Sequence, residues 1–225
     1  MHLSENTVAV LKNFSTINPN LLIKEGQTLS TMSAMKNIVA SASVEESFDQ
    51  QVAIYDLNEF LSVMSLFDQP ELTFKNEFVT IIDGHGSAET KYWYSDPSVV
   101  TSPQKEITMP SEELTFTFNS NMLNQVQKAA AVIGAPDMVL DSNGGSPLLK
   151  VVDKKNATAN DYSVNIDVTA EGNPTYKFWF KVENLKLMPG TYDVTLSSKK
   201  ISHFVNSKNG VDYYIALEPE STYEA

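Results

Sequence analysis

The sequence predicts an α+β protein made of two similar halves. Amphipathic stretches with a period near 3.6 residues indicate helices, and short apolar runs bounded by turn residues indicate strands. The order of helix, strands, short helix and strands occurs twice, the second copy roughly 115 to 130 residues behind the first, which indicates duplicated half-domains because solenoid repeats are much shorter. The 225 residues leave room for two domains of about 110 residues each.

The first half contains two predicted helices. One begins after Ser4, which suits an N-cap, and ends near Thr16, before Pro19. Its apolar side carries Val8, Val10, Leu11 and Phe14, and its polar side carries Glu5, Asn6, Ala9, Lys12, Asn13 and Thr16. The other, at 56–67, has Asp56 as its N-cap. Its apolar side is Leu57, Phe60, Leu61, Met64 and Phe67, opposite Asn58, Ser62 and Ser65.

Strands are predicted around these helices in "LLIKEGQTLS", "LTFKNEFVTII" and "TKYWY", before a connector rich in proline and serine, "SDPSVVTSPQKEITMPSEE". The second half begins with the strand "LTFTF" and the helix "NMLNQVQKAAAVIG". That helix directs Met122, Leu123, Val126, Ala130 and Ile133 to one side, and Asn121, Asn124, Gln125 and Lys128 to the other. Further on, the strand "YKFWF" runs into a predicted short helix in "KVENLKLMPG". We therefore expect one domain at 1–105 and another at 106–225, with the connector at about 95–112.

The charge of the chain argues against sequence-specific recognition of nucleic acid. The formal net charge is -12, and all 16 basic residues are lysine. Arginine has a planar fork that suits bidentate reading of guanine, whereas lysine is a flexible point charge. If the protein meets DNA, it should therefore contact phosphates and not read bases. The adjacent pairs Lys154-Lys155 and Lys199-Lys200 are interpreted as charges that keep loops and strand edges solvated.

No pattern predicts catalysis, a metal site or a cofactor. His2, His85 and His203 are isolated, and the chain has no cysteine. We interpret "DGHGSAE" and "LDSNGGS" as turns, because the first lacks a nucleophile elbow and the second lacks the closing glutamate of a calcium loop. The chain has no apolar run long enough to span a bilayer and no secretory signal pattern, so we expect it to stay in the cytosol.

Five segments occur in a characteristic order: "TVAVLKNFSTIN", "VAIYDLNEFL", "DPSVV", "LKLMPGTY" and "YYIALEPEST". This ordered set resembles the DNA sliding clamps of T-even-type bacteriophages over most of the chain, and least through 140–175. The resemblance implies a DNA-clamp fold with two similar domains, each of which packs two helices on antiparallel β-sheet. It also implies a ring of three subunits, with a continuous outer sheet and helices that line a hole for duplex DNA.

The resemblance implies a processivity factor that encircles duplex DNA and tethers the replicative polymerase without chemistry of its own. The implied partners are duplex DNA, the phage polymerase, an ATP-dependent clamp loader and further copies of the chain, all in the host cytoplasm. No catalytic residue, metal or cofactor is expected. A β-rich phage virion structural protein remains the alternative from another class.

The resemblance also assigns candidate contact residues. A helix that buries its apolar stripe against the sheet presents its polar stripe to the hole, so a lysine there would face phosphate. The DNA-facing candidates are Lys12, Asn13, Asn124, Lys128 and, in the short helix of the second half, Lys186. Clamps of this family bind partner peptides in an apolar pocket beside the connector and the C-terminal segment. The candidate walls of that pocket are Val99, Val100, Leu217 and Pro219.

Overall fold

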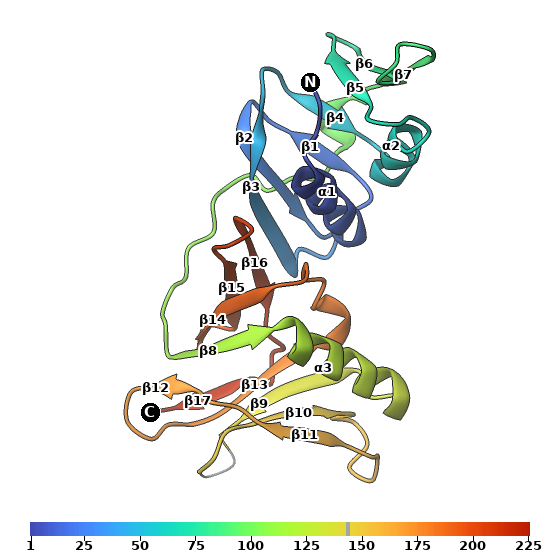
Figure 1. The fold of residues 1–225 in the computed structure, drawn as a ribbon. Helices are drawn as coiled ribbons and strands as arrows, with labels where there is room; N and C mark the ends of the chain where they lie inside the picture. The colour runs from blue at the N-terminus through green and yellow to red at the C-terminus, as the bar shows by residue number, and fades with distance from the viewer. Residues whose placement is uncertain (143–144) are drawn as a thin grey trace. The chain divides into compact units, whose positions relative to one another are not determined.

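The structure is a computed structural model and describes residues 1–142 and 145–225. Its chain divides into two compact units (Figure 1). Unit 1 contains Met1–Lys105 and Asn209–Val211, and unit 2 contains Glu106–Lys208 and Asp212–Ala225. Each unit combines helix with antiparallel strands, which confirms the predicted α+β class. No helix among the described residues is long and apolar enough to cross a membrane.

Unit 1 begins with a helix and continues through short strands. Its helices are α1 (Glu5–Ile17), α2 (Leu57–Met64) and the 3-10 helix η1 (Pro97–Val99). Its strands are β1 (Leu21–Ile23), β2 (Gly26–Met32), β3 (Ile38–Phe48), β4 (Val52–Ile54), β5 (Glu71–Phe74), β6 (Phe78–Ile82) and β7 (Glu89–Trp93). Strand β2 pairs with β3, β1 pairs with β4, and β5, β6 and β7 form a three-stranded meander. The predicted strands at 21–30, 72–82 and 90–94 are thus confirmed.

The core of unit 1 lies between its helices and its strands. Helix α1 packs on β2, β3 and α2. Val10, Leu11 and Phe14 are buried on its inner side, as their helical spacing predicts. Strand β3 alternates buried and accessible residues over most of its length, so one of its faces meets the helix and the other does not.

Unit 2 contains more strands than unit 1, and it has one long helix among its described residues. Its helices are α3 (Ser120–Ile133) and the 3-10 helix η2 (Val182–Asn184). Its strands are β8 (Leu114–Asn119), β9 (Asp137–Asp141), β10 (Leu148–Val152), β11 (Tyr162–Asn165), β12 (Thr169–Ala170), β13 (Thr175–Lys181), β14 (Thr191–Ser197), β15 (Ile201–Asn206), β16 (Val211–Ala216) and β17 (Thr222–Glu224).

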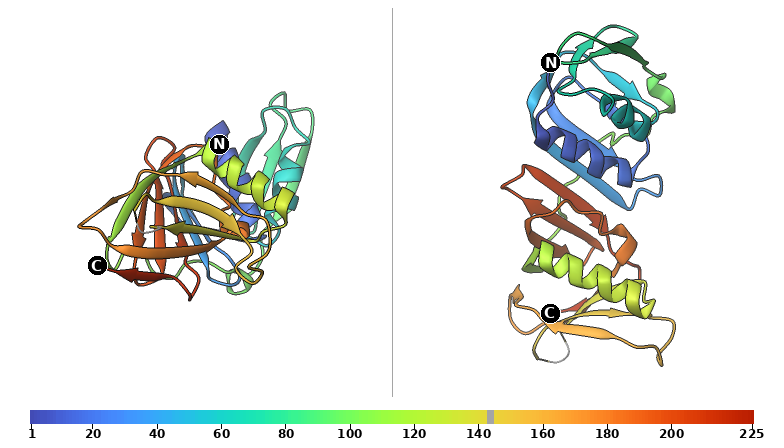
Figure 2. Two further views of the ribbon diagram at one scale, coloured as in Figure 1. Left: turned by 90° about the horizontal axis from the view of Figure 1, so that it is seen from below. Right: turned by 45° about the vertical axis from the view of Figure 1, so that its right-hand side comes forward.

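Two sheets build this unit. One has the strand order β11-β10-β9-β13-β17, and the other contains β12-β8-β14-β15-β16 in that order. Helix α3 lies across strands of its own unit and contacts β8, β10 and η2 (Figure 2). Aromatic rings fill the core beneath it: Phe204 makes edge-to-face contacts with Phe118, Phe180 and Tyr192.

Two local predictions need correction. The short helix expected in "KVENLKLMPG" is a three-residue 3-10 helix, Val182–Asn184, and Lys186 lies beyond its end. Leu185, Leu187 and Met188 are all buried, a spacing that does not fit one face of an α-helix, and Pro189 and Gly190 follow at once. In unit 1, Val8 is only half-buried although the wheel placed it on the apolar side of α1.

Strands β9 and β10 pair from Asp141 and Leu148 onward. The turn predicted at 140–146 includes residues 143–144, which lie outside the described residues. The segment "DGHGSAE" forms the turn between β6 and β7, as predicted.

Candidate nucleic-acid interface

Helix α1 is fixed at its start by two acceptors. Ser4 is the N-cap, and its side chain accepts a hydrogen bond from the Thr7 backbone N–H at 3.2 Å. The buried carboxylate of Glu46, on β3, accepts hydrogen bonds from the Ser4 backbone N–H and from the Thr7 hydroxyl. Strand β3 thereby holds the first turn of the helix.

The position of Glu46 also affects its titration. Burial tends to raise the pKa of this carboxyl, but the hydrogen bonds from Thr7 and Ser4 outweigh burial and lower its pKa below the ordinary value. The group is therefore ionised at neutral pH, and its negative charge stands at the positive end of the helix dipole.

The outer face of α1 carries the first predicted DNA-facing residues. Lys12 is exposed and Asn13 is half-exposed, whereas Leu11 and Phe14 are buried beneath them. Lys12 is the single basic residue of the helix, and Glu5 in the first turn is its single acid. The separation of faces predicted from the sequence is thus confirmed, and the role of these residues stays a prediction.

Helix α3 repeats this arrangement in unit 2. Asn119 caps its start by accepting from the Met122 N–H at 3.0 Å, and Gly134, with a φ of 68°, ends it in the left-handed conformation. Its buried residues are Leu123 and Val126. Asn124 and Lys128 are both exposed on the opposite side. As in α1, a single lysine is the only basic residue of the helix, and α3 carries no acidic residue.

The start of α3 is joined to the turn before β14. The Ser120 N–H donates to the Gly190 carbonyl oxygen at 2.8 Å, and the Gly190 N–H donates to Ser120 Oγ at 2.6 Å. A Cβ atom at Gly190 would lie 2.0 Å from Nδ2 of the buried Asn206. This turn therefore needs glycine for close approach, and it sets where the exposed face of α3 begins.

The remaining predicted DNA-facing position differs from these two. Lys186 is half-buried, follows η2, and belongs to no helix. Helix α2 carries no lysine: its exposed side consists of Asn58, Glu59 and Ser62. Among the described residues, each of the two long helices therefore presents one lysine, and the short helices present none.

The predicted pocket residues divide into exposed and buried members. In unit 1, Val99 ends η1 and is 54% exposed, while the side chain of Val100 packs in a buried cluster with Leu22 and Ala53. In unit 2, Pro219 is exposed and Leu217 is buried in the core. Val99 and Pro219 are thus the members whose side chains reach the surface of their own unit.

Sequence reasoning missed the role of two lysines in unit 2. Lys154 Nζ lies 3.0 Å from a Glu218 carboxylate oxygen and 3.1 Å from one of Glu220, and Lys200 Nζ donates to the Pro219 carbonyl. These contacts hold the segment that carries Pro219. Each lysine belongs to a pair that we interpreted as solvated surface charge. That interpretation is wrong for Lys154, whose side chain is mostly covered, whereas Lys200 is exposed and contacts the segment from the surface.

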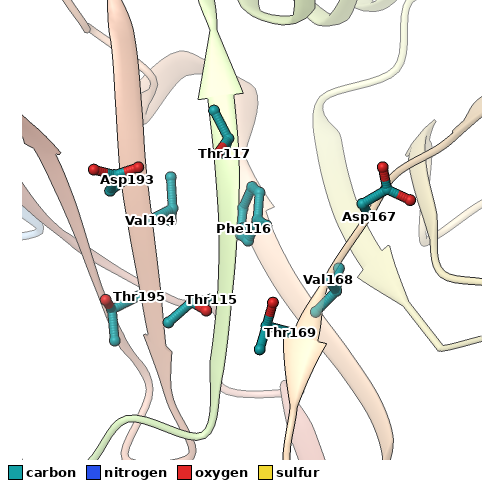
Figure 3. A pocket seen from close by; sticks show the side chains of 9 residues that line it. All are labelled: Thr115, Phe116, Thr117, Asp167, Val168, Thr169, Asp193, Val194 and Thr195. Atoms are coloured by element: carbon teal, nitrogen blue, oxygen red, sulfur yellow. The ribbon is translucent and has the colours of Figure 1, made fainter.

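Two hollows in the described surface are lined by none of the predicted DNA-facing or pocket residues. In unit 2, a hollow of about 410 Å³ is lined by β8, β14 and the segment before β12. Four threonines and two aspartates, Asp167 and Asp193, dominate its lining (Figure 3). In unit 1, a cavity of about 320 Å³ lies among His2, Leu3, Val8, Met64, Gln69 and Pro70. No cluster of metal-ligating side chains occurs in the part of the chain that the structure describes.

Comparison with known families accounts for nearly the whole chain. Residues 4–102 match the family model described as DNA polymerase processivity factor. Residues 115–219 match the model described as gp45 sliding clamp, C terminal. The two matches correspond to the two halves that the internal repetition indicates.

Individual relatives and solved structures agree with these matches. The sliding clamp of Vibrio phage KVP40 is 31% identical over 97% of this chain and 99% of its own. The sliding clamp of Enterobacteria phage T4 is 29% identical over the full length of both chains. The fold is that of the proliferating cell nuclear antigen of A. fulgidus, with a TM-score of 0.68 at 13% identity over 96% of both chains. The match to processivity factors removes the virion-protein alternative. The chain belongs to the family of phage sliding clamps, the non-enzymatic processivity factors of DNA polymerase.

Proposed function

We propose that three copies of this chain form a closed ring around duplex DNA, and that the exposed faces of α1 and α3 line the hole. The observation that carries this proposal is the matched placement of Lys12 and Lys128. Each is the single lysine on the solvent-exposed face of a long helix. A ring of three copies would present six such lysines to the phosphates. Asn13 and Asn124 are the proposed polar neighbours, and Lys186 is a weaker candidate because it is half-buried.

The charge distribution supports retention by topology instead of by affinity. Each copy has a net charge of -12 and has no arginine. Duplex DNA carries one phosphate charge for about every 1.7 Å of its axis, so a few lysines neutralise only a small part of it. Contacts of this kind are weak, mobile and indifferent to base sequence, which is what a sliding protein needs.

Polymerase and other partners are proposed to bind through short peptides. Two clamps of the same fold were solved with such ligands: the Helicobacter pylori beta clamp with a DNA ligase peptide, and the A. fulgidus protein with the C-terminal region of FEN-1. In this chain Val99 and Pro219 are exposed apolar residues of the segments expected to serve this purpose. Val100 and Leu217 would support those segments from beneath.

Ring opening is proposed to require a separate ATP-dependent loader in the host cytoplasm. The sequence contains no Gly-rich phosphate loop followed by lysine and serine or threonine, so the energy for opening should come from another protein.

Release from circular and linear DNA tests the ring. Clamp loaded on a nicked circle should persist through a wash in moderate salt, because a closed ring leaves a circle only by opening. Cutting the circle once should release the clamp quickly, and blocking both ends with bulky proteins should restore retention. Equal release from cut and uncut circles would show that contacts, and not topology, hold the protein.

A further inference from the structure

The segment after β16 returns along the edge of unit 2 and is held by backbone hydrogen bonds. The Leu217 N–H donates to the Lys200 carbonyl at 2.9 Å, and the Glu218 N–H donates to the Trp179 carbonyl at 2.8 Å. In return, the Trp179 N–H donates to Ser221 Oγ at 2.9 Å. Strand β17 then pairs with β13 and completes the edge of the sheet. We call residues 217–221 the tail segment.

Side chains from two other loops close over this segment. Lys154, in the turn after β10, bonds through Nζ to both Glu218 and Glu220 and lies 5.9 Å from the centre of the Trp179 ring. Its side chain is only 13% exposed. From the turn between β14 and β15, Lys200 Nζ donates to the Pro219 carbonyl. Two lysines thus contact three consecutive residues of the tail segment.

The ion pairs keep the Lys154 ammonium charged in a nearly buried position. Burial tends to lower the pKa of this amine, but hydrogen bonds to Glu218 and Glu220 raise it more, so its pKa lies above the ordinary value. The Glu218 pair should contribute more than the Glu220 pair, because the Glu218 side chain is 23% exposed and that of Glu220 is 59% exposed.

We propose that Lys154 and Lys200 are positioning residues for partner binding, which hold the tail segment in one conformation so that Pro219 is presented to an apolar partner peptide. This inference rests on the proposed function, in which partners bind at that segment. A surface that is ordered before binding loses less conformational entropy when the partner arrives. Since the order depends on ion pairs near the surface, added salt should weaken partner binding at this site.

The two lysine pairs offer a matched control. The double variant Lys154→Ala/Lys200→Ala removes the side-chain bonds of both lysines to the tail segment. The double variant Lys155→Ala/Lys199→Ala changes the net charge equally, at exposed side chains with no hydrogen bond or ion pair to other described residues. Both variants are made in the full-length chain. The probe is the purified replicative DNA polymerase of the same phage, titrated onto immobilised clamp at low and moderate salt, with hydrogen exchange of residues 217–221 measured in parallel.

We expect the Lys154/Lys200 variant to bind polymerase roughly three- to tenfold more weakly, since partly exposed ion pairs contribute modestly each. Its tail segment should exchange faster, and its binding should depend less on salt. The control variant should match the native chain in all three measurements. Lys154→Arg in place of Lys154→Ala should restore binding, because a guanidinium at this position can reach the carboxylates of both Glu218 and Glu220. The variant Glu218→Gln/Glu220→Gln, which leaves Lys154 intact, should reproduce the loss.

Three results would overturn the inference. Unchanged affinity together with faster exchange would show that the order of the tail segment does not matter to the partner. An equal loss in the control variant would show a general effect of net charge. Failure of the native clamp to bind polymerase at all would instead reject the proposed tethering function, and the positioning role with it.

Discussion

Glu46 illustrates how one carboxylate on a strand determines where a helix begins. It bonds to Ser4 and Thr7, residues that lie 42 and 39 positions away in the chain. The N-cap at Ser4 is evident from the sequence because capping is local, whereas the contribution of Glu46 depends on the fold and has no local signal.

Replacing Glu46 with glutamine should destabilise unit 1 by about 1 to 3 kcal/mol at neutral pH, because the substitution weakens hydrogen bonds to an ionised group. The folded-state pKa of Glu46 is lowered, so its stabilisation is present above the ordinary glutamate range and is lost as pH falls through the folded pKa. The native and variant proteins should therefore converge in acid, as measured by urea unfolding across a pH series. Glu45→Gln, at the exposed neighbour, is the control. A difference that stays constant with pH would contradict this account.

The lysine pairs set a limit on what the sequence can reveal at this scale. Lys154 and Lys155 are adjacent and chemically identical, yet one bonds to glutamates 64 and 66 positions later while the other is exposed. Neither periodicity nor charge count separates them. Only the return of the tail segment along β13 distinguishes the two.

At the scale of elements, the helices are the best-predicted part of the molecule. The residues buried on α1 and α3 lie on the sides that the helical wheel predicts, because caps and apolar spacing are local properties. At the edges of those sides Val8, Met122, Ala130 and Ile133 are only half-buried. The segment at 181–190 was mispredicted because its buried residues follow a 3-10 helix in a stretch without regular secondary structure, which periodicity alone does not detect. Strands β10 to β12 lie where the sequence resemblance is weakest, β9 lies at the start of that stretch, and the sequence left all four unassigned.

The buried sides of α1 and α3 should be equivalent in burial. Leu11 and Val126 are each 1% exposed. Leu11→Ala should cost about 2 to 5 kcal/mol and Val126→Ala less, because the smaller side chain leaves a smaller cavity. Asn124→Ala, on the exposed side of α3, should cost little. Chemical denaturation of each variant measures these values, and a comparable loss at Asn124 would mean that the faces are reversed.

The exposed sides of the same helices should govern contact with DNA. Replacing Lys12 and Lys128 with alanine should reduce loading or processivity, and should lower the slope of log affinity against log salt by about 0.9 for each phosphate that the variant no longer neutralises. Loading assays over a range of salt measure this slope. Lys155→Ala, away from the helices, is the control. Unchanged function in the double variant would exclude these two lysines as the residues that meet DNA.

At the scale of the whole molecule, family membership follows from the complete chain and not from any single site. The two family matches cover residues 4–102 and 115–219, whereas no group of side chains among the described residues could hold a metal ion. The duplicated order of elements was visible in the sequence, because repetition survives where individual residues differ.

Solution mass tests the proposed assembly. A closed ring should scatter light as a particle of about three times 24.9 kDa. The net charge of -12 per chain should keep such rings from associating further. A monomer at micromolar concentration would weaken the ring proposal, and indefinite assembly would contradict it.

Lys154 and Lys155 should differ in how readily their amines are acylated. Acylating reagents attack the neutral amine, and with no arginine in the chain every basic side chain is a potential target. The Lys154 amine is shielded between two carboxylates, and its raised pKa leaves little of it deprotonated. The neighbouring Lys155 amine is exposed. The two neighbouring lysines thus place a protected amine beside a reactive one in the same chain. The extent of acylation at Lys154 relative to that at Lys155 therefore reports the state of the tail segment.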